Sequence, residues 1–128
     1  MTDEDRPRGY LIALRHTVVA LDLAQAVADF DPTAPVLILP GPAEALSALS
    51  QVTSLALAFV AEAPAAFRGS PLEAAIRARG GEVVLLGEAA ELEGETMGYA
   101  VLLRPFTAEN VAACLTEAAA RRTRMALS

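Results

Sequence analysis

The chain of 128 residues contains no lysine and no tryptophan, and it has one cysteine and one histidine. Cys114 alone excludes an internal disulfide, and with His16 it leaves too few ligands for an ordinary zinc site. The net charge of −6 argues against a nucleic-acid partner, because phosphates require a basic surface. No apolar run approaches the roughly 18 residues that span a bilayer. The polar start, MTDEDRPRG, does not resemble a signal peptide. We therefore expect a cytoplasmic protein with no cofactor, no nucleic-acid partner and no membrane partner.

Aromatic residues are also scarce, at 5 %, whereas apolar residues make up 54 % of the chain. The core must therefore be built from Ala, Leu and Val. The length suits one domain with a single core. We expect residues 1–8 to form a flexible lead and residues 9–128 to form the domain.

Apolar runs suited to strands recur along the chain, separated by segments with helical spacing or by loops. The expected strands lie at about 10–14, 35–39, 54–60, 82–86 and 99–103. The third is apolar on both faces, as a central strand of a parallel sheet should be.

Helical patterns follow these runs. Val19, Leu23, Val27 and Phe30 recur at spacings of three and four, which predicts a helix over 17–30 with Thr17 as its cap. Further helices are expected over 42–50, 71–79 and from residue 107 onward. We expect a loop at 62–70 and a short or frayed helix with loop at 87–98.

Five β-α units in this order predict a parallel sheet with right-handed crossovers. The expected fold is α/β and flavodoxin-like, a (βα)5 three-layer sandwich with strand order 2-1-3-4-5. In this architecture function concentrates at the carboxyl ends of the strands. The candidate residues are therefore those that end each apolar run.

Three stretches resemble the receiver domain of response regulators, the CheY-like superfamily, over about residues 9–120. They are ALDLAQAVADF, PAEALSAL and, most specifically, VLLRPFTAENVAACL. The last is similar to the receiver pattern of apolar strand, Lys-Pro-Phe, Thr cap and amphipathic helix. The resemblance implies a cis Arg104–Pro105 peptide bond.

A working receiver, as the resemblance implies, accepts a phosphoryl group on an aspartate at the third strand. An acidic pair after the first strand holds Mg²⁺, and a Ser or Thr and a Lys contact the phosphoryl oxygens. The matching positions here hold Leu14 and Arg15 (or Arg15 and His16 in a shifted register), Phe59, Gly87 and Arg104. The last aspartate of the chain is Asp31, so no shift supplies an acceptor. We expect a degenerate receiver with neither phosphorylation nor Mg²⁺ at the usual site.

Several roles remain open for the residues at these positions. Arg104 would pair with Glu62 or Glu88, or bind a partner or an anion. Arg15 would pair with the same carboxylates, or join His16 and Arg104 in binding an anion such as a nucleotide phosphate. Phe59 is most simply a core residue that fills the former acid pocket.

The resemblance also implies a partner surface formed by the fourth helix, fifth strand and fifth helix, with homodimerisation through it. The candidate surface residues are Glu88, Glu91, Tyr99, Arg104, Phe106, Cys114, Arg121 and Arg122. The leading hypothesis is a pseudo-receiver in bacterial signal transduction that binds proteins without phosphorylation and without catalysis. A small-molecule sensor for anions at the strand ends is the alternative. A third hypothesis is an enzyme, for which His16 would be the candidate base.

Overall fold

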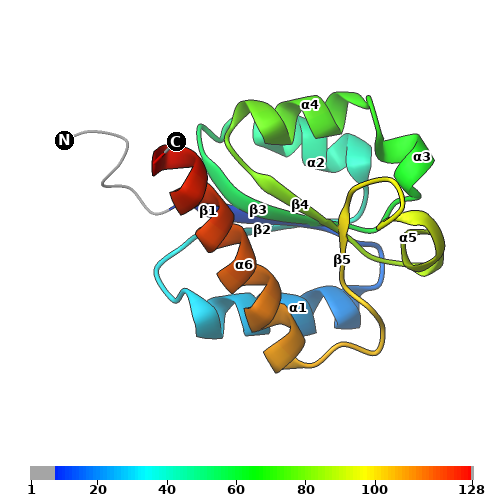
Figure 1. The fold of residues 1–128 in the computed structure, drawn as a ribbon, viewed down its shortest axis with the longest axis horizontal. Helices are drawn as coiled ribbons and strands as arrows, with labels where there is room; N and C mark the ends of the chain where they lie inside the picture. Colours follow the sequence, from blue (N-terminus) through cyan, green and yellow to red (C-terminus); the bar gives the residue numbers. More distant parts are fainter. Residues whose placement is uncertain (1–7, 128) are drawn as a thin grey trace.

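The computed structural model describes residues 8–127, except for the side chains at positions 122, 123 and 125–127. Most of the expected lead at 1–8 therefore lies outside the described residues. Five parallel strands form the sheet: β1 (Gly9–Ala13), β2 (Val36–Leu39), β3 (Leu55–Val60), β4 (Glu82–Leu85) and β5 (Ala100–Val101). Their order, β2-β1-β3-β4-β5, confirms the predicted topology (Figure 1).

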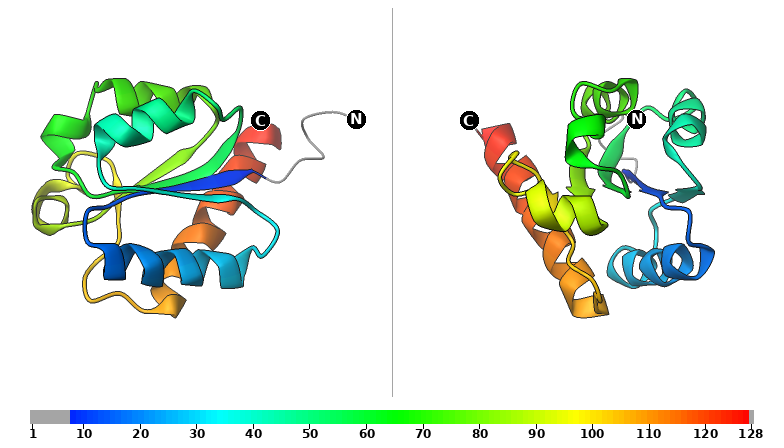
Figure 2. Two further views of the ribbon diagram at one scale, coloured as in Figure 1. Left: turned by 180° about the vertical axis from the view of Figure 1, so that it is seen from behind. Right: turned by 90° about the vertical axis from the view of Figure 1, so that its right-hand side faces the viewer.

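The helices cover both faces of this sheet. They are α1 (Thr17–Phe30), α2 (Pro42–Leu49), α3 (Pro64–Phe67), α4 (Pro71–Ala78), α5 (Glu88–Glu93) and α6 (Ala108–Leu127). Helices α1 and α6 lie on one face, and α2 and α4 on the other, which gives the three layers seen in Figures 1 and 2. None of the described helices is long and apolar enough to cross a bilayer.

Two elements differ from the sequence-based expectation. Helix α3 replaces part of the expected loop, because Pro64 suits a first helical turn and the fully buried Phe67 holds the segment against the core. Strand β5 is shorter than expected. Leu102 makes the last backbone hydrogen bond to β4, to Leu85, and Leu103 is already exposed.

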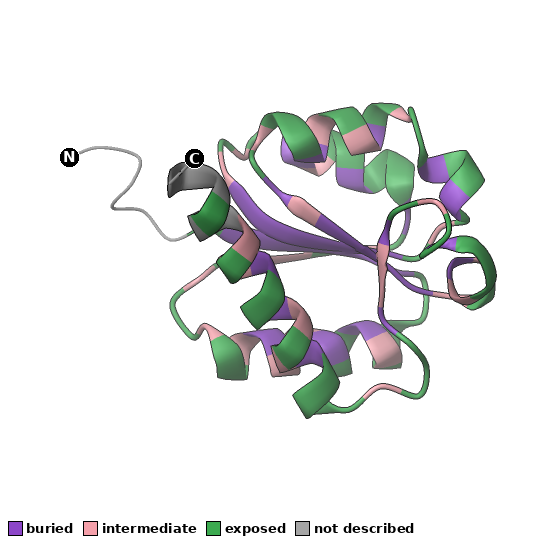
Figure 3. Ribbon diagram, viewed as in Figure 1, coloured by how far each residue is buried: buried purple, intermediate pink, exposed green. Residues whose placement is uncertain are grey.

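The core consists of two apolar clusters, one on each face of the sheet. Residues of β1, β3 and β4 alternate between them: Ile12 and Phe59 face α1 and α6, whereas Ala13 and Val60 face α2 and α4. The central strands are buried along their whole length, as Figure 3 shows. The alternation fixes which side chains can reach the carboxyl ends of the strands.

The helix starts show how sequence sets local structure. At the start of α6, the Asn110 N–H donates to the Thr107 hydroxyl (3.1 Å) and the Thr107 N–H donates to the Asn110 side-chain oxygen (2.9 Å). This reciprocal cap satisfies two backbone donors. The expected Thr17 cap is not formed, because Thr17 is the first residue of α1. His16 occupies the N-cap position without a capping side-chain hydrogen bond.

Candidate functional site

The carboxyl ends of the five strands meet at one edge of the sheet. The residues that follow them are Leu14 after β1, Ala61 after β3 and Leu86 after β4, each held by a backbone hydrogen bond to the neighbouring strand. The loops beyond these residues form the candidate site. The positions that match the receiver pattern lie in these strands or in the loops that follow them.

Phe59 does not reach this edge. It lies one residue inside β3, fully buried in the cluster between the sheet and helices α1 and α6. Val60, which ends the strand, is also buried. The position matched to the phosphoacceptor therefore contributes only apolar packing in this chain.

The first strand ends in a similar way. Leu14 belongs to the same core cluster, whereas Arg15 and His16 are exposed. They line a cavity of about 290 Å³ with Pro40, Gly41 and residues of β1 and β3, and no acidic residue lines it. Mg²⁺ requires oxygen ligands, so this lining does not fit the ion. Among the described residues, no three His, Cys, Asp or Glu side chains form a group that could hold a metal ion.

Glu62, in the loop after β3, is the first carboxylate that follows this strand in the sequence. Its Oε2 atom is buried and has no hydrogen-bond partner among the described residues. Burial raises the pKa of the Glu62 carboxyl above its ordinary value. The proposed pairing of Arg15 or Arg104 with Glu62 is therefore wrong, since neither guanidinium forms an ion pair with it in the described structure.

Gly87, matched to the receiver Ser or Thr, has a φ of 113° and precedes α5 as its N-cap. Residues with a side chain rarely adopt this conformation. The backbone itself therefore disfavours a hydroxyl residue at this position.

Arg104, matched to the receiver lysine, pairs with Glu91 on α5, which corrects the expected pairing with Glu62 or Glu88. Its Nε lies 2.8 Å from Glu91 Oε2, and its Nη2 lies 3.3 Å from Oε1. The Arg104 backbone N–H also donates to Oε2, at 3.2 Å. The hydrogen bond from Arg104 lowers the pKa of Glu91, and the same contact raises the pKa of Arg104. This is the bidentate geometry that arginine favours.

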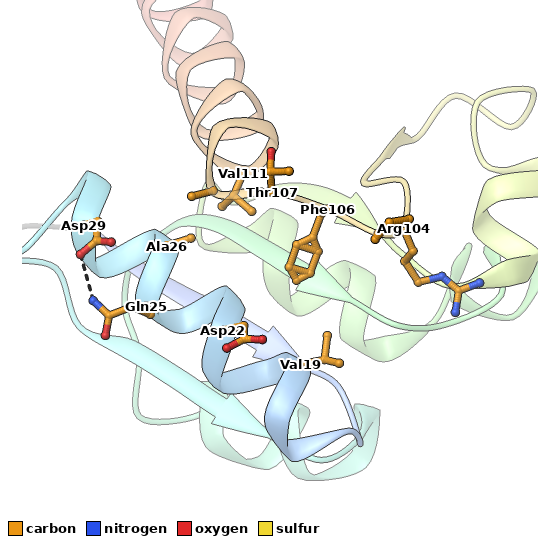
Figure 4. Close-up of a pocket in the computed structure, with 11 residues that line it drawn as sticks. Val19, Asp22, Gln25, Ala26, Asp29, Arg104, Phe106, Thr107 and Val111 are labelled. Atoms are coloured by element: carbon orange, nitrogen blue, oxygen red, sulfur yellow. Dashed lines mark hydrogen bonds between the residues drawn. The ribbon is translucent and has the colours of Figure 1, made fainter.

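The Arg104–Pro105 peptide bond that follows is cis. Beyond it, Phe106 and Thr107 line a groove of about 480 Å³ between α1 and the start of α6. In Figure 4 the guanidinium of Arg104 points away from this groove, whereas the ring of Phe106 points into it. Asp22 and Asp29 of α1 stand on the other side. Arg15 and Arg104 therefore line different cavities and do not converge on one anion.

The predicted partner surface is changed in two respects. Tyr99 is buried: its hydroxyl donates to Glu73 Oε2 at 2.6 Å and its ring packs edge-on against Phe67. Leu92 and Leu103, which the sequence reasoning missed, are 75 % and 60 % exposed. The signal for Leu103 was strand alternation, since its neighbour Leu102 faces the core.

The other surface candidates are placed as follows. Glu88 is exposed, Phe106 and Cys114 are half-buried, and Arg121 Nε lies 3.4 Å from Glu82 Oε1. Burial raises the pKa of the Cys114 thiol. The side chain of Arg122 lies outside the described residues.

Comparison with known proteins gives a fold but no family. No family model and no curated protein matches the chain. Two solved structures of the chemotaxis response regulator CheY4 of Vibrio cholerae match it with TM-scores of 0.65 and 0.63, at 14 % and 13 % identity. Each match covers 88 % of this chain and 98 % of the other. The chain therefore shares the flavodoxin-like fold of these two structures.

Proposed function

We propose that this chain is a non-phosphorylatable pseudo-receiver, a protein-interaction module in bacterial signal transduction without catalytic activity. The main support is the third strand end, where Phe59 is buried, Val60 is buried, and the chain has no aspartate after Asp31. Arg104, which is matched to the receiver lysine, already forms an ion pair with Glu91 rather than facing an open anion site. Partner binding would then depend on a fixed surface rather than on an added phosphate charge.

Phosphorylation can be tested directly by incubating the folded protein with acetyl phosphate and Mg²⁺ and measuring its intact mass. We expect no phosphoryl adduct, while a receiver with its aspartate intact, treated in parallel, shows one. A stable adduct on the native chain would refute the proposal. Mapping that adduct to Glu62 would identify the replacement acceptor.

The partner surface in this proposal is the α5–β5–α6 surface, defined here by Glu88, Glu91, Leu92, Leu103, Arg104, Phe106, Cys114 and Arg121. Its support is the exposure of two leucines beside the Arg104–Glu91 pair, since apolar anchors ringed by charges are typical of interaction sites. The expected partner is a signalling protein or, as in a receiver homodimer, a second copy of the chain.

The surface can be tested with a partner isolated by affinity capture and then purified. Replacing Leu92 or Leu103 with glutamate should weaken binding, measured by calorimetry, by about tenfold or more. Val18→Glu is the matched control, because Val18 is 72 % exposed and belongs to α1, outside the residues that define this surface. Equal losses in all three variants would argue against the assignment.

The anion-sensor alternative has less support. Arg15 and Arg104 line separate cavities, and Glu91 already neutralises Arg104. A thermal-shift screen with nucleotides and inorganic phosphate separates the two hypotheses. Stabilisation that depends on Arg15 would favour the sensor, whereas no stabilisation favours the interaction module.

A further inference from the structure

The outer edge of β2 is an open sheet edge. In the described structure, β2 pairs with β1 on one side and with no strand on the other. Edge strands usually carry a charge, a proline or a bulge that blocks pairing with another chain. Residues Val36–Leu39 contain no charge and no proline, and Pro35 and Pro40 bound the strand at its two ends. The shortness of β2 and its flanking prolines limit any added pairing to these 4 residues, and within them no charge or proline blocks a second strand.

Apolar side chains line both sides of the same edge. Ile38 of β2 is 41 % exposed, and Leu46 on the neighbouring helix α2 is also exposed. In the right-hand view of Figure 2, β2 forms the edge of the sheet farther from α6, with α1 on one face of it and α2 on the other. The edge thus presents an apolar strip next to unpaired backbone groups.

Helix α1 contributes its own uncharged flank. Ala20, Leu23 and Val27 are buried against the sheet, and Val19, Asp22 and Ala26 line the groove toward α6. Because successive helix positions lie about 100° apart, positions 21, 24 and 28 lie on the opposite flank, toward β2. These positions hold Leu21, Ala24 and Ala28, and Leu21 is 56 % exposed.

Charge at the ends of α1 indicates what covers this edge. The first turn of α1 has no acidic residue and is preceded by the exposed Arg15, which has no ion-pair partner among the described residues. Its last turn has no basic residue, and Asp29 and Asp31 lie at its end. Both ends are opposite to what the dipole of an isolated helix favours. An antiparallel copy of α1 would correct both ends at once.

We infer that two copies of this chain associate through their β2 edges. The two β2 strands pair antiparallel about a twofold axis, so that one sheet runs through both copies. The axis sets Arg15 of one copy beside Asp29 and Asp31 of the other, twice, and packs the flanks that carry Leu21 against each other. In a chain with a net charge of −6, this uncharged strip with complementary ends is suited to a self-complementary contact. The inference goes beyond the proposed function, because it leaves the α5–β5–α6 surface at the other edge free for a partner.

The inference is tested by light scattering coupled to size exclusion over a range of concentrations of the full chain. We expect a mass of two copies for the unmodified protein. Ile38→Lys should raise the dissociation constant by about tenfold or more, because it places a charge on the strand edge. Leu103→Lys, a matched change on the α5–β5–α6 surface, should leave the dimer intact.

Charge reversal gives a second measurement that does not depend on the strand. Arg15→Glu should weaken association, and adding Asp29→Arg should restore it, since both residues are exposed. A monomer at every concentration, a dimer unaffected by both Ile38→Lys and Arg15→Glu, or a dimer broken only by Leu103→Lys would each overturn the inference. The last result would instead support dimerisation through the α5–β5–α6 surface.

Discussion

Two regions at the same edge of the sheet differ in how their polar groups are satisfied. At the β5–α6 corner, Thr107 and Asn110 cap each other and Arg104 is held by Glu91. At the β1 and β3 ends, Arg15 is exposed without an ion-pair partner among the described residues, and Glu62 has a buried oxygen without a hydrogen bond. The corner completes its own interactions, whereas the strand ends do not.

The difference shows that a receiver-like fold can form without the acidic residues that the receiver pattern places at the strand ends. The corner combines two residues that are close in the chain, Thr107 and Asn110, with a contact from Arg104 to Glu91 on the preceding helix α5. The strand ends have the apolar residues Leu14 and Phe59 where the receiver pattern places acids. Of their charged side chains, Arg15 is exposed to solvent and Glu62 has one oxygen buried.

The largest effect is expected from restoring an aspartate at the matched position. Phe59→Asp places a carboxylate in a fully buried apolar cluster and removes a large ring. We expect a loss of about 4 kcal/mol or more in the free energy of unfolding. Urea denaturation followed by circular dichroism measures it, with Phe59→Leu as the control at about 1 kcal/mol. A folded Phe59→Asp variant that accepted phosphate would show that the strand end still serves this chemistry.

A smaller effect is expected at the two helix starts. Thr107→Ala removes one half of the reciprocal cap of α6 and should cost about 1 kcal/mol. His16→Ala, at the N-cap position of α1, should change stability little, because His16 forms no capping side-chain hydrogen bond. Thermal unfolding of both variants compares them directly, and equal losses would remove this part of the contrast.

The Arg104–Glu91 pair should contribute less, because both side chains reach solvent. The hydrogen bond from Arg104 lowers the pKa of Glu91 below its usual 4.5. The stability it supplies is therefore present above that value and is lost as pH falls through the lowered pKa. A double-mutant cycle of Arg104→Ala and Glu91→Ala, measured at pH 7 and at acid pH, should show coupling only at pH 7. Coupling that persists in acid would contradict an ionic origin.

The sequence predicted those features that depend on neighbouring residues. The bounds of α1 followed from the spacing of Val19, Leu23 and Val27, and the strand order followed from the β-α alternation. The start of α6 was predicted from Thr107 as a capping residue. Its hydroxyl accepts a hydrogen bond from the N–H of Asn110, three residues later.

Features that depend on the approach of distant segments could not be predicted in this way. Several glutamates precede Arg104 in the chain, and the direction of α5 decides that Glu91 is the one that binds. The burial of Tyr99 depends likewise on Glu73 and Phe67, which lie on α4 and α3. Helix α3 exists because tertiary packing buries Phe67, since four residues are too short to form a stable helix alone.

The smallest effect should come from Glu62, and its sign is the most informative. Burial raises the pKa of this carboxyl above 4.5, so the folded chain holds its proton more readily than the unfolded chain. Stability is then lost as pH rises through the raised pKa, and above it the charged carboxylate opposes folding. Glu62→Gln should raise the melting temperature by about 1–3 °C at pH 7 and have little effect near pH 4. The exposed Glu95→Gln is the control, with no change at either pH. If Glu62→Gln instead lowered the melting temperature at pH 7, the carboxylate would have a favourable partner in solution. The polar groups at the strand ends would then be satisfied like those of the β5–α6 corner, with a cation or a partner protein contacting Glu62.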